Sequence, residues 1–228
     1  RYPRQRSATL SERPEARSIP TKSFGIFTGA CKMSRYSTSD IYIDPVTGVL
    51  RNRLGIDDQA ELEQCEAAFV AARSYELSQA PLKGSFDLDH LRAIHRYLFG
   101  DVYDWAGQLR LIDISKGSNH FAHHGHLETA AASIFSKLAQ DQYLIGLDRI
   151  AFSQRAAYYL GELNALHPFR EGNGRAQREF ISHLAATNGY YIAWENIGQA
   201  EMLDAAIQSF TGNLAPLSRL IRENLTGK

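Results

Sequence analysis

Apolar residues recur at helical spacing along most of the chain from residue 57 onward. The first such stretch carries a stripe made of Leu62, Cys65, Phe69 and Ala72. Asp57 and Asp58 are placed to cap its start, and Pro81 and Gly84 end it. This pattern predicts one long amphipathic helix near the beginning of the patterned region.

The same period continues through the rest of the chain. Two further apolar stripes are formed by Leu88, Leu91, Ile94 and Leu98, and by Phe152, Ala156, Leu160, Leu163 and Leu166. Helices are also expected over 127–144, 175–187, 199–211 and 214–225. The exception is 108–122, where alternating apolar residues lead into a Lys-Gly-Ser-Asn turn typical of a hairpin. We therefore predict an all-α fold with one small β-hairpin.

The first 36 residues differ in composition from the rest. They hold eight basic and two acidic side chains, a net charge of +6, and residues 37–228 carry a net charge of −6. The segment is rich in Pro, Ser and Arg and shows no helical period. We expect a basic extension or linker over 1–36 and one domain over 37–228. Met33, which stands just before 34–56, is a candidate for an alternative translation start.

Composition narrows the classes of function. The 25 basic and 25 acidic residues cancel, which argues against direct nucleic-acid binding through a global positive field. No run of 18 apolar residues and no secretory signal is present, so no membrane association is expected. Cys31 and Cys65 are too few for a disulfide framework, which favours a soluble protein in a reducing compartment.

The segment 167–178, HPFREGNGRAQR, has the residues of a phosphate-binding loop. Pro168 ends the preceding helix, and Gly172 and Gly174 bracket Asn173 just before the next helix. At this position three backbone amides can turn toward one point, where the helix dipole also favours an anion. The segment therefore predicts a cradle for phosphate.

Four charged or titratable side chains add chemistry to this segment. Arg175 and Arg178 are three residues apart and share a helix face that we expect to face the loop. Glu171 is the only carboxylate of the loop, and Mg²⁺ is usually held by one or two carboxylates plus phosphates. His167 can accept a proton near neutral pH. Each residue type is more often structural when met alone, but their co-occurrence favours phosphate transfer chemistry.

HPFREGNGR followed by Arg178 matches in every defined position the HxFx(D/E)GNGRxxR signature of the Fic (filamentation induced by cAMP) family. The resemblance extends over most of 42–225. It includes the segments DPVTGVLRNRLGI, FDLDHLRAIHRYLFGDVYDWAGQLR, ISKGSNHFA and GELNALHPFREGNGR. The chain resembles in particular Fic toxins linked to bacterial conjugation and type IV secretion. This implies a Fic-type helical core with a hairpin flap, and transfer of AMP from ATP to a hydroxyl of a target protein.

The resemblance also implies a role for each residue of the motif. His167 would be the base that takes the hydroxyl proton, and Glu171 would be the Mg²⁺ ligand. The residues that would hold ATP are Gly172, Asn173 and Gly174 at its diphosphate, Arg175 as a phosphate clamp and Arg178 at the γ-phosphate. ATP and Mg²⁺ are thus the expected substrate and cofactor.

A flap that adds the target's backbone as a further strand is implied as well. Its residues are Ile112, Asp113, Ile114, Ser115, Lys116, Gly117 and Phe121. The family's precedents for targets are topoisomerase subunits of the producing bacterium and GTPases of a host cell. The expected location is the bacterial cytoplasm, with translocation into a recipient or host cell as the alternative.

Many family members are inhibited by a helix bearing [ST]xxxE[GN], whose Glu pairs with the second arginine of the motif. Ser11 and Glu15 have this spacing but lack the final Gly or Asn, whereas Glu195 and Asn196 have the ending but follow Tyr191 at the hydroxyl position. We therefore expect no built-in inhibitory motif. A separate small antitoxin protein that carries [ST]xxxE[GN] is the expected partner.

Two other functions remain open from the sequence. The chain could be a regulatory module that binds ATP without transferring it, or a phosphotransferase on the same fold. The intact His167 favours a transferase, because binding alone needs no base. His123, His124 and His126 could form a metal cluster, but they lack acidic or cysteine companions, which favours a surface or target-contacting role.

Overall fold

The computed structural model describes residues 40–116 and 119–227. The expected extension over 1–36, the alternative start at Met33, the spacing at Ser11 and Glu15, and Gly117 of the flap lie outside the described residues. The described part is mostly helical, as the sequence predicts, and it includes two short antiparallel sheets. No helix within it is long and apolar enough to cross a membrane.

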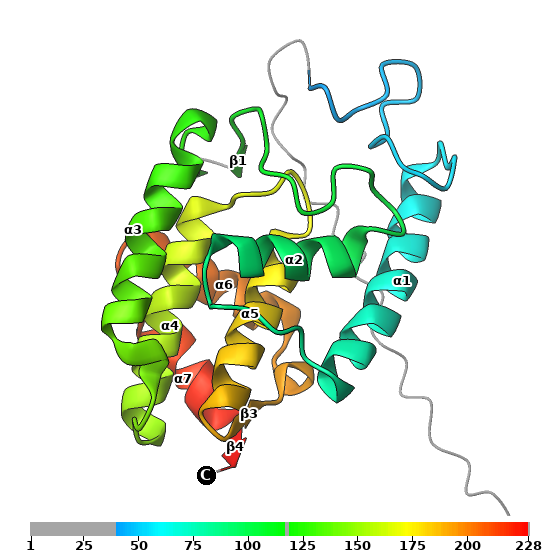
Figure 1. Ribbon diagram of the computed structural model, residues 1–228. Coiled ribbons are helices and arrows are strands. Elements are labelled where there is room, and N and C mark those ends of the chain that lie inside the picture. The colour runs from blue at the N-terminus through cyan, green and yellow to red at the C-terminus, as the bar shows by residue number, and fades with distance from the viewer. Residues whose placement is uncertain (1–39, 117–118, 228) are drawn as a thin grey trace, which may run out of the picture.

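Helix α4 (Arg149–Leu166) is the centre of the fold. It packs against α3 (Leu127–Gln140), α5 (Asn173–Thr187), α6 (Gln199–Phe210) and α7 (Ala215–Glu223) (Figure 1). All the apolar residues of its predicted stripe are buried: Phe152, Ala156, Leu160, Leu163 and Leu166. The loop that follows α4 is therefore anchored to the most heavily packed element of the core.

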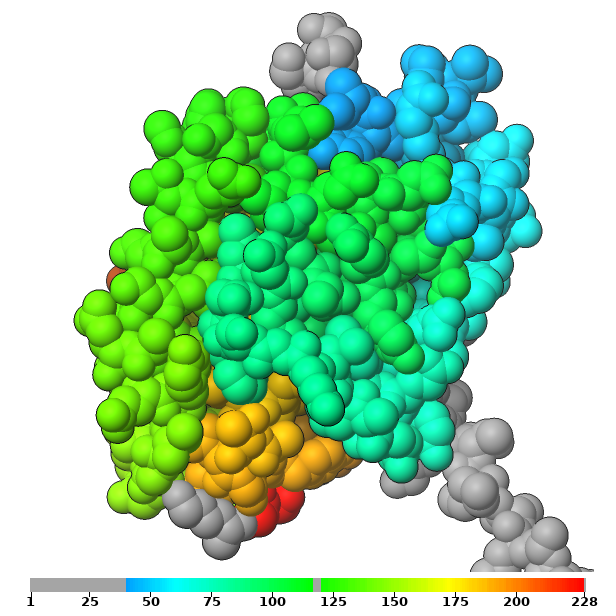
Figure 2. Space-filling model, viewed as in Figure 1, coloured from blue at the N-terminus to red at the C-terminus, as the bar shows by residue number. Residues whose placement is uncertain are grey.

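Helix α2 (Leu88–Phe99) covers one side of α5. Its N-cap Asp87 accepts a hydrogen bond from the backbone N–H of His90 at 2.8 Å, which satisfies one of the free amides of the first turn. The predicted residues Leu91, Ile94 and Leu98 are fully buried. Figure 2 shows α2 and the segment after it as a continuous surface in front of α5.

Helix α1 (Gln59–Gln79) forms as predicted but turns a different face to the core. Asp58 is its N-cap, accepting from the N–H of Glu61 at 2.9 Å. The buried residues are Leu62, Glu66, Val70 and Leu77, whereas the predicted stripe members Phe69 and Ala72 are exposed. The prediction of the buried face was wrong because a charged residue, Glu66, occupies a core-facing position.

Two predicted helices end earlier than expected. Helix α3 stops at Gln140, and the 3₁₀ turn η2 (Gln142–Leu144) follows it with positive φ angles of 51°, 52° and 62° at its three residues. Helix α7 stops at Glu223, because β4 (Leu225–Gly227) pairs antiparallel with β3 (Tyr190–Ile192). The sequence analysis missed this second sheet, and also the 3₁₀ turn η3 (Trp194–Asn196).

The predicted hairpin is present as β1 (Ser115–Lys116) and β2 (Asn119–His120), with Ser115 opposite His120. The 3₁₀ turn η1 (His124–His126) then leads into α3. The hairpin lies at the same end of the molecule as the loop between α4 and α5, drawn in yellow in Figure 1. The fold thus brings the predicted flap and the predicted phosphate loop together.

Residues 40–56 pack at this same end. Asp40 forms a buried ion pair with Arg170 of the α4–α5 loop, 2.8 Å from Nη2, and the two side chains are only 6% and 3% exposed. The hydroxyl of Tyr42 accepts a hydrogen bond from the backbone N–H of Leu111 at 3.1 Å. These contacts connect the start of the described chain to both the loop and the base of the flap.

Candidate active site

His167 ends α4 in a left-handed backbone conformation, with φ 46° and ψ 62°. Its N–H donates to the carbonyl of Leu163 at 3.0 Å. This conformation costs a residue with a side chain about 1–2 kcal/mol, so the surroundings must hold it in place. Arg110 does so by donating from Nε to the carbonyl of His167 at 2.9 Å.

The imidazole of His167 is half-buried and held in one tautomer. Its Nδ1 lies 3.2 Å from the carbonyl oxygen of Asn164. Because a carbonyl only accepts, Nδ1 carries the hydrogen and Nε2 keeps its lone pair. The ring stacks on Phe121, with centroids 3.7 Å apart.

The surroundings keep this imidazole neutral. Burial lowers the pKa of His167 to about 3, the hydrogen bond to Asn164 opposes this shift, and the positive charges of Arg110 and Lys116 add to it. At pH 7 the ring is therefore uncharged and can accept a proton at Nε2.

Arg110 joins the flap to the His167 loop. The residue is 1% exposed, and its guanidinium donates to the carbonyl of Ile112 at 2.7 Å and to that of Ala122, in addition to that of His167. Its backbone N–H donates to the carbonyl of Pro168 at 2.9 Å. The sequence analysis missed this residue. Leucines alternate with polar residues around it, which suggests that the leucines are buried. In the structure Arg110 is buried and its neighbour Leu111 is 65% exposed.

The side chain of Asn173 closes the loop on itself. Its Oδ1 accepts from the N–H of Phe169 at 2.9 Å, and its Nδ2 donates to the carbonyl of the same residue at 2.7 Å. Phe169 is fully buried and stacks on His95, with ring centroids 3.8 Å apart. The amide side chain is thus used for loop structure, and only the backbone of Asn173 remains for a ligand.

The start of α5 presents two free amides. The backbone N–H groups of Asn173 and Gly174 have no hydrogen-bond partner among residues 40–116 and 119–227. The third predicted amide, that of Gly172, instead donates to the carboxylate of Glu171 at 2.9 Å. Gly172 has φ 77°, and a Cβ at this position would lie 2.3 Å from the ring of Phe99. The cradle therefore has two free amides rather than the three predicted, and its backbone shape depends on Gly172.

His95 supports the carboxylate-bearing residue of the loop. The N–H of Gly107 donates to its Nδ1 at 2.9 Å, so Nε2 carries the hydrogen and donates to the carbonyl of Glu171 at 2.9 Å. Burial lowers the pKa of His95 to about 3, although the bond to Glu171 opposes this. The carboxylate of Glu171 is half-exposed beside the free amides, and it is a fitting ligand for Mg²⁺.

Arg175 is held by α1, a contact that the sequence analysis missed. Its Nη1 lies 2.6 Å from the carboxylate of Glu66, its Nη2 lies 3.6 Å from that of Glu171, and its guanidinium lies over the ring of Phe99. The hydroxyl of Tyr103 donates to the second oxygen of Glu66 at 2.5 Å. The sequence did offer one signal for this contact: Glu66 lies four residues after Leu62, at a position of the helix that faces the core.

Arg178 borders a pocket and has no ion pair with any residue that the structure describes. Burial and, to a lesser degree, the charge of Arg175 lower its pKa to about 10, although the charge of Glu179 opposes the shift. The pocket is lined by Leu160, Asn164, Gly174, Gln177, Arg178, Met202, Ala206 and Leu217. A half-buried guanidinium that has no ion pair within the described residues is suited to bind an anion. Glu195, which has the ending of the inhibitory motif, accepts a hydrogen bond from the hydroxyl of Tyr191 at 3.1 Å rather than pairing with Arg178.

The predicted flap residues have different surroundings. Ile114 is buried, so its side chain belongs to the core, and Phe121 packs on His167. Lys116 is exposed, Ile112 and Ser115 are half-exposed, and Asp113 contacts two histidines. A target could therefore reach the backbone and the outer side chains of this segment, but not the side chain of Ile114.

Comparisons with known proteins agree with this arrangement. Residues 85–185 match the Fic/DOC family. The chain is 55% identical over 195 residues to the protein adenylyltransferase VbhT of Bartonella schoenbuchensis, which covers 85% of this chain and 41% of VbhT. It is 42% identical over 192 residues to the probable protein adenylyltransferase y4lH of Sinorhizobium fredii, covering 83% of this chain and 98% of that protein.

Solved structures show the same fold. The BepC protein of Bartonella tribocorum, a VirB-translocated effector with bound AMPPNP, superposes with a TM-score of 0.80 and is 25% identical, covering 85% of this chain and all of that chain. The N-terminal Fic domain of a VirB-translocated effector from Bartonella quintana, with bound ADP, gives a TM-score of 0.79 at 28% identity, covering 82% and 95% of the two chains.

Proposed function

Because this chain belongs to the Fic/DOC family, we propose that it is a protein adenylyltransferase, which transfers AMP from ATP to a hydroxyl side chain of a target protein. One observation carries this proposal. A neutral His167, held in one tautomer, begins the short loop that leads into α5, where two backbone amides are free at the helix start and Arg178 has no ion pair with a described residue. A proton acceptor and an anion site so close together suit transfer of a phosphoryl-type group to a hydroxyl.

His167 is the base in this reaction. Its Nε2 takes the proton of the target hydroxyl while that oxygen forms a bond to the α-phosphorus of ATP, and the bond from this phosphorus to the diphosphate breaks. General base catalysis of this kind contributes about 10²–10⁴-fold to the rate. Arg110, the Asn164 carbonyl and Phe121 keep the imidazole in place without touching the substrate.

The start of α5 holds the phosphates. The free amides of Asn173 and Gly174 donate to the diphosphate, and the positive end of the α5 dipole adds to this attraction. Arg175 and Arg178 bind the outer phosphate oxygens. Glu171 holds Mg²⁺, which neutralises negative charge on the phosphates when it is bound. Apolar side chains of the adjoining pocket, among them Leu160 and Met202, favour the less polar part of the nucleotide.

The partners belong to the same proposal. A target protein adds a strand along the flap, and a topoisomerase subunit or a GTPase is the class of target that the family suggests. A small antitoxin supplies a glutamate to Arg178, which has no carboxylate partner among the described residues. The likeness to VirB-translocated effectors supports delivery by type IV secretion from the bacterial cytoplasm.

Labelled ATP tests the proposal. The chain is incubated with bacterial or eukaryotic lysate and with ATP labelled in either the α- or the γ-phosphate. We expect protein-bound label only from the α-position, loss of labelling in His167→Ala, and full labelling in the exposed control His126→Ala. Label from the γ-position would indicate a phosphotransferase. ATP binding without any protein-bound label would indicate a regulatory module.

Glu171→Gln tests the metal ligand separately. We expect weaker binding of MgATP in calorimetry, with binding of metal-free ATP almost unchanged, because the carboxylate contacts the ion. Equal loss of both would show that Glu171 acts on the loop rather than on Mg²⁺.

A further inference from the structure

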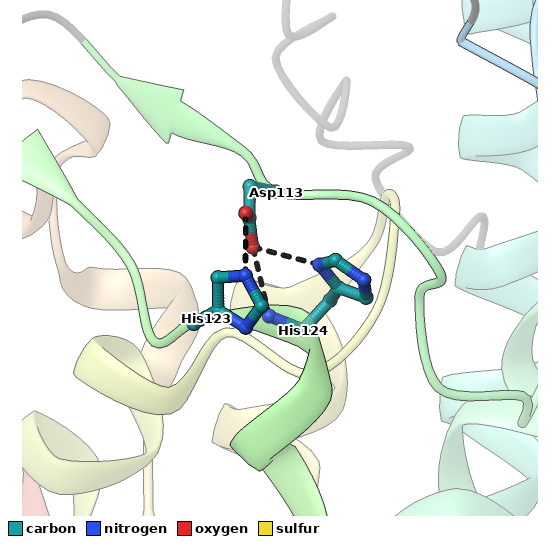
Figure 3. Close-up of side chains that lie close together, drawn as sticks. All are labelled: Asp113, His123 and His124. Carbon is teal, nitrogen blue, oxygen red and sulfur yellow. Dashed lines mark hydrogen bonds and ion pairs between the residues drawn. The ribbon is translucent and has the colours of Figure 1, made fainter.

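Three polar side chains meet at the base of the flap, outside the α4–α5 loop. Asp113 precedes β1, whereas His123 and His124 follow β2, and Figure 3 shows the carboxylate placed between the two imidazoles. One carboxylate oxygen is 3.0 Å from Nδ1 of His124, and the other is 3.2 Å from Nε2 of His123. One ligand atom from each residue lies within 4.8 Å of the others.

This arrangement corrects one conclusion of the sequence analysis. The histidines were judged to lack an acidic companion, but the hairpin brings Asp113 back to them from ten residues earlier in the chain. Sequence spacing could not show this contact, because it depends on closure of the hairpin.

We propose that Asp113, His123 and His124 form a binding site for a divalent transition-metal ion, for which Zn²⁺ is the fitting probe. Two imidazole nitrogens and one carboxylate oxygen are a common set of three protein ligands for Zn²⁺, with water at the remaining position. For bonds of about 2.0–2.2 Å, neighbouring ligands of a tetrahedral ion lie about 3.3–3.6 Å apart. The two histidine nitrogens lie 3.0 and 3.2 Å from different oxygens of the Asp113 carboxylate, and one ligand atom from each residue lies within 4.8 Å of the others. The carboxylate, which is 54% exposed, therefore has to turn to offer one oxygen to the ion.

The carboxylate of Asp113 is 54% exposed and accessible to a cation. It accepts hydrogen bonds from the backbone N–H of His124 at 2.8 Å and from Nδ1 of the same residue at 3.0 Å. One group opposes cation binding: Nη1 of Arg110 lies 3.7 Å from Oδ1. That guanidinium already donates to three carbonyl oxygens, which partly offset its charge.

Metal binding changes the hydrogen atoms on both rings in a defined way. Nδ1 of His124 donates to Asp113, so a metal at Nδ1 moves that hydrogen to the other nitrogen of the ring. Nδ1 of His123 accepts from the N–H of Gly125 at 3.1 Å, so its Nε2 now carries the hydrogen. A metal at this Nε2 requires the hydrogen on Nδ1, and the N–H of Gly125 then loses its acceptor. The amide of Gly125 is therefore a reporter of the site.

The bound ion would connect the two ends of the flap hairpin. None of its ligands belongs to 167–178, so the site is separate from the proposed Mg²⁺ ligand Glu171 and is independent of the proposed function. Binding can therefore be measured without ATP or target.

Calorimetry with Zn²⁺ tests the site. The full chain is prepared with Cys31→Ser and Cys65→Ser to remove both thiols, stripped with a chelator and titrated with ZnCl₂. We expect one bound ion. Asp113→Asn and His124→Gln should each weaken binding at least about tenfold, since even the loss of a group outside the ligand set costs 10–100-fold. The matched control His120→Gln, an exposed flap histidine outside the cluster, should bind as the parent does.

A second measurement separates metal binding from damage to the flap. In ¹H–¹⁵N spectra, the Gly125 amide should shift when Zn²⁺ is added to the parent, and should not shift in His124→Gln. No binding by the parent would overturn the proposal, as would binding of equal strength in Asp113→Asn and His124→Gln. An unmoved Gly125 amide in a zinc-bound chain would also overturn it, because the ion would then lie elsewhere.

Discussion

Replacement of Gly172 by alanine tests whether close packing under the phosphate loop fixes its shape. Gly172 has φ 77°, and an added Cβ would lie 2.3 Å from Cζ of Phe99. The left-handed backbone costs an alanine about 1–2 kcal/mol. Phe99 is fully buried and stacks on His95 with centroids 4.7 Å apart, so overpacking adds about 1–3 kcal/mol. We expect Gly172→Ala to lower the free energy of unfolding by about 2–5 kcal/mol.

A second glycine separates the two costs. Gly212 has φ 82°, but a Cβ there meets no heavy atom within 4 Å. Gly212→Ala should therefore show the backbone cost alone, about 1–2 kcal/mol. Any gain from reduced freedom of the unfolded chain applies to both variants and cancels in the comparison.

Urea unfolding followed by circular dichroism gives both free energies, and calorimetry gives the affinity for MgATP. Gly172→Ala should also lose affinity, because a shifted loop moves the amides of Asn173 and Gly174, whereas Gly212→Ala should not. In the background of Phe99→Leu, the cost of Gly172→Ala should fall, as expected for coupled neighbours. Equal destabilisation by the two alanine variants would refute the close contact with Phe99.

Three other variants test contacts around the site. Glu66→Gln should raise KM for ATP more than it lowers kcat, because Arg175 loses the carboxylate that orients it for binding; an unchanged KM would contradict this. Arg110→Met should lower kcat while ATP affinity is retained, and should cost at least about 1.5–3 kcal/mol in urea unfolding, the value of one hydrogen bond to a charged group. His95 has a pKa of about 3 in the fold, well below its value of about 6.5 when unfolded, so the unfolded chain binds more protons between these pH values. His95 alone should therefore lower stability by up to about 1.4 kcal/mol per pH unit below pH 6.5, in addition to the similar contribution of His167. His95→Asn should show a shallower slope over pH 7 to 4, and an equal slope would assign the effect to other groups.

The sequence predicts those helices whose apolar period agrees with their surroundings. The α4 stripe is buried throughout because α4 lies at the centre of the fold. The face of α1 was predicted wrongly because its core position holds Glu66, whose burial is explained only by Arg175 and Tyr103 from distant segments. The pairing of β3 with β4 was missed for the same reason, since about 35 residues separate Tyr191 from its partner Thr226.

The motif identified the loop, but its geometry also depends on contacts that the motif does not reveal. Nothing in HPFREGNGR indicates that the Asn173 side chain is used inside the loop, or that the amide of Gly172 turns to Glu171. Arg110 was missed because a single arginine between leucines gives no sign of which side is buried. Arg110 holds the carbonyl of His167 from 57 residues away, a contact that periodicity cannot predict.

Mass spectrometry of modified proteins tests the central claim most directly. The chain is added with ATP and Mg²⁺ to bacterial and eukaryotic lysates, in parallel with His167→Ala, and modified peptides are identified. The account predicts peptides that carry AMP on a Tyr, Thr or Ser hydroxyl with the parent chain, and none above background with His167→Ala. AMP-bearing peptides of equal abundance with both chains would contradict the role of His167, and phosphate in place of AMP would contradict the proposed reaction.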